Sequence, residues 1–164
     1  MQTKLISAAA LLLAATLSHA ADGKKAAASI PDNTPILIQA EVGSLDKRVE
    51  VAYVCDSQQG KRNVNAMYGI KDGETAVVQI KVGDQVTPGL WRVMNDTNGK
   101  KQNSYYGEGL TWITDKASPD TLTKANGKIL MQASKLDGGL PKGDQTILFK
   151  DCKVDSAASK KLNK

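Results

Sequence analysis

The sequence contains few histidines, cysteines and aromatic residues. Its 164 residues include one histidine, two cysteines and one phenylalanine, and aromatic residues make up 4% of the chain. The histidine, His19, lies at the end of an apolar N-terminal stretch. If cleavage removes this stretch, the remaining chain contains no histidine. Ser–His and Cys–His nucleophilic pairs and His-based zinc or copper sites are then excluded. We therefore expect a protein that is not an enzyme and holds no metal and no cofactor.

The chain also lacks an apolar run long enough to cross a membrane. Its longest such run, Leu5 to Leu17, follows the basic Lys4 and precedes Ser18-His19-Ala20, a small-x-small cleavage pattern. This order is typical of a secretory signal, whereas a spanning helix needs about 20 apolar residues. We predict a signal peptide at residues 1–20, a mature chain from Ala21 and no membrane span. The predicted location is the periplasm of a Gram-negative bacterium or its outer-membrane surface.

The two cysteines, Cys55 and Cys152, each follow a strand-like apolar segment. Export to an oxidising compartment favours a disulfide between them, and free or metal-bound thiols are the alternative. Such a bond closes a long loop, which in the chain-entropy model contributes about 4 kcal/mol to stability. We expect the bond to be structural.

Short alternating segments separated by Gly, Asn and Asp fill the region between the cysteines. Val49, Val51 and Tyr53 alternate with more polar neighbours, and similar alternation recurs in the next segments. In these segments we predict that Val64, Ala66 and Tyr68 share the inward face of one strand, and that Ala76, Val78 and Ile80 share the inward face of the next. About eight such strands, with no long amphipathic helix, predict an all-β antiparallel barrel or sandwich.

This β domain is predicted at residues 47–153. A flexible leader is predicted at residues 21–46, where Pro31 and Pro35 interrupt helix formation and residues 36–42 are a candidate edge strand. A polar, frayed tail is predicted at residues 154–164. The net charge is +5, but the basic residues are scattered along the chain with acidic residues between them, which argues against nucleic-acid binding.

Both ends of the β region resemble one family. The opening contains Tyr53-Val54-Cys55, the turn Gly60-Lys61, Val64 and Tyr68-Gly69-Ile70, and the close is Ile147-Leu148-Phe149-Lys150-Asp151-Cys152. These segments resemble the Neisseria adhesin complex protein family, which is similar to the periplasmic and membrane-bound inhibitors of c-type lysozyme. The resemblance covers residues 49 to 152 and implies a small eight-stranded antiparallel β-barrel.

The same resemblance implies a lysozyme-binding site. The inhibitors carry a Ser-Gly-x-x-Tyr segment, then Leu-x-x-Trp and a Thr-Lys-Gly turn, and they use the serine and the lysine to enter the lysozyme cleft. The comparable run here extends from Ser104 to Lys116, which are the nearest matches for the two residues. No glycine follows Ser104, and Asp115 precedes Lys116.

Adjacent aromatic residues have opposite orientations on a strand. We expect Trp112 and Tyr106 to fill the barrel and Tyr105 to be exposed as part of the binding site. Glu108 and Asp115 are the only candidate pair of carboxylates for glycoside hydrolysis, and we interpret them as surface charges.

The resemblance therefore implies an exported inhibitor of host c-type lysozyme, with Ser104, Tyr105 and Lys116 at the interface. A surface adhesin that binds host cells is the alternative, and one protein can do both. A small-molecule carrier is a third class, disfavoured because side chains usually fill so small a barrel.

Overall fold

The computed structural model describes residues 39, 40 and 42–164, which belong to one compact unit, residues 35–164. The predicted signal peptide and leader residues 21–38 lie outside the described residues. The described part contains nine strands, one 3-10 helix and one α-helix. Their bounds are β1 Lys47–Ser57, β2 Gly60–Lys71, β3 Glu74–Val82, β4 Gln85–Val86, β5 Leu90–Arg92, β6 Gln102–Gly107, β7 Leu110–Asp115, η1 Pro119–Lys124, β8 Gly127–Asp137, β9 Leu140–Val154 and α1 Ser156–Leu162.

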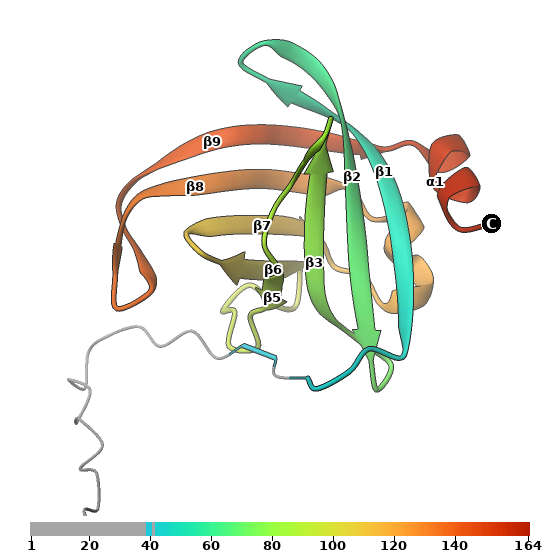
Figure 1. The fold of residues 1–164 in the computed structure, drawn as a ribbon, viewed down its shortest axis with the longest axis horizontal. Coiled ribbons are helices and arrows are strands. Elements are labelled where there is room, and N and C mark those ends of the chain that lie inside the picture. The colour runs from blue at the N-terminus through green and yellow to red at the C-terminus, as the bar shows by residue number, and fades with distance from the viewer. Residues whose placement is uncertain (1–38, 41) are drawn as a thin grey trace, which may run out of the picture. The chain divides into compact units, whose positions relative to one another are not determined.

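Eight of these strands close into an antiparallel barrel, as predicted. The described strands pair in the order β2-β1-β9-β8-β7-β6-β5-β3, and the β2–β3 pairing completes the ring. The two-residue β4 lies outside it, paired to β3. In Figure 1, β1 to β3 form one wall and β6 to β9 run across it as the other.

Tight turns fix the register of the long hairpins. Asp72 and Gly73 join β2 to β3, Glu108 and Gly109 join β6 to β7, and all four have positive φ. Two consecutive positive φ values define a type I′ turn, whose twist matches that of the flanking strands. In the second hairpin this turn sets Gly107 opposite Leu110 and Tyr105 opposite Trp112.

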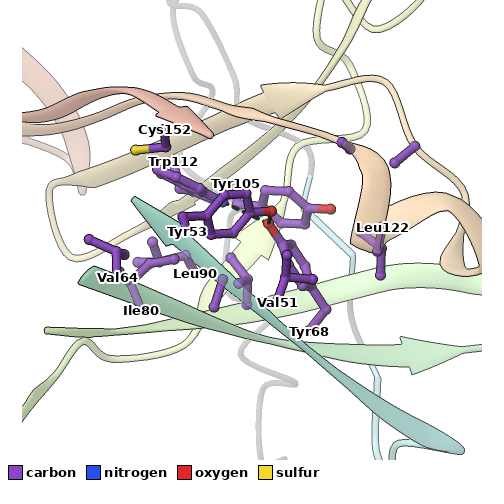
Figure 2. Close-up of a cluster of buried hydrophobic side chains, with 14 of the residues drawn as sticks. Val51, Tyr53, Val64, Tyr68, Ile80, Leu90, Tyr105, Trp112, Leu122 and Cys152 are labelled. Carbon is purple, nitrogen blue, oxygen red and sulfur yellow. Dashed lines mark hydrogen bonds between the residues drawn. The ribbon is translucent and has the colours of Figure 1, made fainter. Parts of the chain in front are cut away.

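The inward faces follow the sequence pattern. The three predicted sets, on β1, β2 and β3, are at most 7% exposed, so the predicted alternation is confirmed. Four large aromatic side chains fill the centre of the barrel, namely Tyr53, Tyr68, Tyr105 and Trp112 (Figure 2). Trp112 Nε1 donates to the Tyr68 hydroxyl at 3.0 Å, and the Tyr53 and Tyr68 hydroxyls are 3.1 Å apart. Burial raises the pKa of all three tyrosines, so their hydroxyls remain neutral.

Cys55 and Cys152 form the predicted disulfide. It joins β1 to β9 with the two Cα atoms 3.9 Å apart, and both side chains are fully buried. The β1–β9 ladder aligns only three described residue pairs and shifts register between Val54 and Asp56. The bond therefore reinforces the barrel where strand pairing is irregular.

The C-terminal segment is not frayed, so that expectation was wrong. Helix α1 packs on the outside of β1, where Ser159 is 1% exposed. The Ser159 hydroxyl accepts a hydrogen bond from Ala52 N at 2.9 Å, and Asn163 Nδ2 donates to Glu50 O at 2.6 Å. These tertiary hydrogen bonds hold a helix too short to be stable alone.

Two shorter segments complete the ends of the barrel. Residues 119–124 form the 3-10 helix η1, and its Leu122 is buried in the core. At the N-terminal side, Gln39 pairs with Val93 in an isolated antiparallel bridge, which places one residue of the candidate edge strand at the sheet. The remaining residues of that candidate strand are 36–38 and 41, which lie outside the described residues, and Ala40 and Val42, which form no strand.

Candidate binding site

The β6–β7 hairpin carries all three residues predicted to bind a partner, but it orients them differently. Ser104 and Tyr105 lie on β6, and Lys116 follows the last residue of β7. Since successive side chains of a strand alternate between faces, Ser104 is on the outside of the barrel and Tyr105 on the inside. Only Lys116 is exposed.

The Ser104 hydroxyl is already engaged. It donates to Asp96 Oδ2 at 2.5 Å, and Gln102 Nε2 donates to the same oxygen at 3.1 Å. Asn98 N donates to Asp96 Oδ1 at 2.8 Å, so the segment 94–101 folds over Ser104, which is 7% exposed. Burial raises the pKa of Asp96, but the hydrogen bonds and the positive charge of Arg92 outweigh burial and hold that pKa below its ordinary value.

Tyr105 is fully buried, so the expectation of an exposed Tyr105 was wrong. Its register partner is Trp112, and the two residues therefore share the inner face. The Tyr105 hydroxyl donates to Thr75 Oγ1 at 2.8 Å, and the Arg92 guanidinium carbon lies 5.5 Å from the centre of the ring. Trp112 fills the interior as expected.

Tyr106 was expected inside and lies instead on the outer face, where it is 5% exposed. Its hydroxyl donates to Gly139 O, in the β8–β9 turn, at 2.5 Å. The long β8–β9 hairpin thus covers Tyr106.

Lys116 is an exposed cation at the end of β7. Its backbone N donates to Lys101 O at 3.2 Å, which joins the end of β7 to segment 94–101. The neighbouring Asp115 carboxylate lies 3.7 Å from Lys128 Nζ, whereas Lys116 forms no ion pair within the described residues. Lys100 and Lys101 are also exposed, and we call these three lysines the Lys116 corner.

The two candidate carboxylates for glycoside hydrolysis lie at opposite ends of the hairpin. Glu108 is in the β6–β7 turn, and Asp115 ends β7 opposite Gln102. Five residue steps of strand separate the two ends, about 17 Å at the usual rise per residue. Flanking carboxylates of a glycosidase are at most about 9.5 Å apart, so this pair cannot act on one sugar bond.

One cavity of the structure was not predicted from the sequence. It is an open cavity of about 930 Å³ at the end of the barrel where β7 begins, and Leu110 contributes to its wall. Lys116 follows the other end of β7. The cavity and the Lys116 corner therefore lie at opposite ends of the barrel.

No group of three His, Cys, Asp or Glu side chains suited to a metal ion occurs among the described residues. Within the same part of the chain, no helix has both the length and the apolar character needed to cross a bilayer.

Comparison with known proteins supports the resemblance inferred from the sequence. The family model Nm-ACP, described as an ACP-like domain, matches residues 49–154. Comparison with curated proteins finds no match. A solved structure, the Adhesin Complex Protein from Neisseria meningitidis, is similar with a TM-score of 0.48 and 23% identity, over 65% of this chain and 99% of that one. The family match spans both disulfide cysteines and all the barrel strands except the first two residues of β1, and the chain belongs to the Neisseria adhesin complex protein family.

Proposed function

We propose that the protein is an exported, non-enzymatic inhibitor of c-type lysozyme that blocks the active-site cleft through the Lys116 corner. The observation that carries the proposal is an exposed lysine without an ion-pair partner among the described residues, at the position where the resemblance expects the inhibitory lysine. A lysozyme cleft contains two carboxyl groups on either side of the sugar bond. An ammonium group placed between them forms a charge-assisted hydrogen bond with the ionised carboxylate and excludes substrate.

The other two residues of the proposed site contribute indirectly. Ser104 holds Asp96 and with it segment 94–101, which carries Lys100 and Lys101. Tyr105 supports the inner side of the same strand. We therefore assign direct contact with lysozyme to Lys116, and positioning of the Lys116 corner to Ser104 and Tyr105.

Net charge does not assist this association. The whole chain is +5, and removal of Lys4 with the signal peptide changes this to +4. Since c-type lysozymes are also basic, long-range repulsion slows encounter, and the affinity must come from short-range pairing. The association rate is therefore expected to rise with salt concentration.

The decisive experiment is titration of the mature protein into a cell-wall lysis assay with c-type lysozyme, with g-type lysozyme as the control. Loss of c-type activity near stoichiometric inhibitor, with g-type activity unchanged, supports the proposal. Full c-type activity at large molar excess contradicts it. Mass measurement of the exported protein tests the proposed start at Ala21 and the location outside the inner membrane.

Host-cell adhesion is the second candidate function, and membership of the adhesin complex protein family favours it. Binding of the labelled mature protein to host cells in lysozyme-free medium would support this function independently of inhibition. Binding that disappears when lysozyme is removed would instead assign the contact to lysozyme.

A further inference from the structure

The open end of the barrel has the form of a ligand site. Its cavity of about 930 Å³ is lined by the tip of the β1–β2 hairpin, the end of β3 with β4, and parts of β7, β8 and β9. This volume lies within the range of small-molecule sites, about 300–1,000 Å³. Among the described residues, the four central aromatic side chains and Leu122 of η1 belong to the packed core, and the cavity lies at the end beyond them.

Unequal hairpin lengths leave this end open. β6 and β7 have six residues each, whereas β8 and β9 have 11 and 15 and β1 and β2 have 11 and 12. The long hairpins extend beyond the short one, and no described helix covers them as η1 covers the other end. An eight-stranded barrel can hold one small ligand when side chains do not fill it.

The cavity wall has an apolar part and a polar part, the latter contributed by Ser57, Gln58, Gln59, Gln85, Thr87, Gln132 and Thr146 together with one charged residue. Ile80, Leu110, Leu130, Leu148 and Phe149 contribute to the apolar part, and Val86 and Ile147 lie at its edge. Val86 is 53% exposed and Ile147 is 44% exposed. Exposure of these apolar side chains to water is unfavourable, and a bound apolar chain would cover them. The apolar part of the wall suits a hydrocarbon chain.

One charged side chain lines this cavity. Arg62 is the only charged residue among the described residues that line the cavity, and no described carboxylate lines it. Arg62 Nη2 donates to Gln59 Oε1 at 2.6 Å, and Arg62 forms no ion pair within the described part of the chain. A guanidinium group has five N–H donors and pairs with a carboxylate through two of them. The remaining donors are therefore available to an anionic head group.

We propose that this cavity binds a fatty acid, with its hydrocarbon chain against Leu110, Leu130 and Phe149 and its carboxylate paired to Arg62. The ligand class follows from one cation at the cavity and from an apolar patch in an otherwise uncharged wall. Because the Lys116 corner is at the opposite end of the barrel, fatty-acid binding and lysozyme inhibition are independent.

The test is displacement of a fluorescent fatty-acid analogue from delipidated mature protein by three matched ligands below their micellar concentrations. Dodecanoate is expected to compete at least about tenfold better than dodecanol or dodecyltrimethylammonium, because only the carboxylate pairs with Arg62. Equal competition by all three ligands, or no displacement of the analogue, overturns the proposal.

Two variants locate the head group. Arg62→Gln is expected to weaken dodecanoate binding about tenfold while leaving dodecanol binding unchanged, and Ile147→Asp to weaken dodecanoate binding by like-charge repulsion. Arg48→Gln, at an exposed arginine elsewhere on the β1–β2 hairpin, is the matched control. Unchanged thermal unfolding of each variant shows that folding is intact. An Arg62→Gln variant that retains full preference for dodecanoate overturns the assignment.

Discussion

The indole ring of Trp112 packs directly against the backbone of Gly127. A Cβ atom added to Gly127 would overlap Trp112 Cη2 and would lie 2.9 Å from Cys152 Cβ. Gly127 also pairs with Cys152 in the β8–β9 ladder, so the largest aromatic side chain, the disulfide and the start of β8 meet at one glycine. Any side chain here displaces either the ring or the bridged strand.

Gly127→Ala is therefore expected to destabilise the barrel by overpacking, by about 1–3 kcal/mol. Urea unfolding followed by Trp fluorescence measures this change. Gly43→Ala is the matched control, because nothing lies within 4 Å of a Cβ at Gly43 and its φ is not positive. Equal stability of the two variants would contradict the close packing.

Removal of the disulfide is expected to be costly because it holds the irregular β1–β9 seam. The double variant Cys55→Ala with Cys152→Ala should lose about 2–5 kcal/mol of unfolding free energy. Urea titrations of the oxidised wild type, the reduced wild type and the variant measure this loss. A reduced wild type as stable as the oxidised form would show that strand pairing alone closes the seam.

Ser159→Ala tests whether α1 stabilises the barrel. The substitution leaves the backbone N–H of Ala52 without its partner, and an unsatisfied buried donor costs about 1–3 kcal/mol. Ser156→Ala, at an exposed position of the same helix, is the control and should change stability by less than about 0.5 kcal/mol. If both serines tolerate alanine equally, α1 contributes little to the fold.

The barrel was predictable because its determinants are local. Alternation at Val49, Val51 and Tyr53 gives the inner face of β1, and the export predicted from residues 1–20 favoured the disulfide. Helix α1 could not be found in this way, because it is held by hydrogen bonds between Ser159 or Asn163 and a strand about 110 residues away, and it has no apolar periodicity of its own.

The predicted orientation of Tyr105 was wrong, although the sequence contained enough information to determine which face of the strand it occupies. Alternation says that Tyr105 and Tyr106 face opposite sides, but not which faces inward. A two-residue turn at Glu108-Gly109 sets Tyr105 opposite Trp112, and a buried tryptophan then determines the face. The cavity had no such signal, because its size depends on the relative lengths of hairpins that are far apart in sequence.

Asp96 should make stability depend on pH. Its pKa is lowered in the folded state, so its contribution is fully present above the unfolded pKa and is lost as pH falls through the folded pKa. Asp96→Asn is therefore expected to reduce stability at pH 7, with a smaller difference from wild type near pH 3. Urea unfolding at both pH values measures the two differences. Asp84→Asn, at an exposed turn, is the control, and a difference for Asp96→Asn that is independent of pH would contradict the assigned role.

Lys116→Ala tests the proposed contact with lysozyme. Charged hydrogen bonds contribute about 1.5–3 kcal/mol, so the inhibition constant should rise at least about tenfold. Lys81→Ala removes an exposed lysine from β3 and serves as the matched control, with an unchanged inhibition constant and unchanged unfolding. Because Ser104 acts through Asp96, Ser104→Ala should weaken inhibition less than Lys116→Ala does. If the wild type inhibits and Lys116→Ala inhibits equally well, a different surface of the barrel enters the lysozyme cleft.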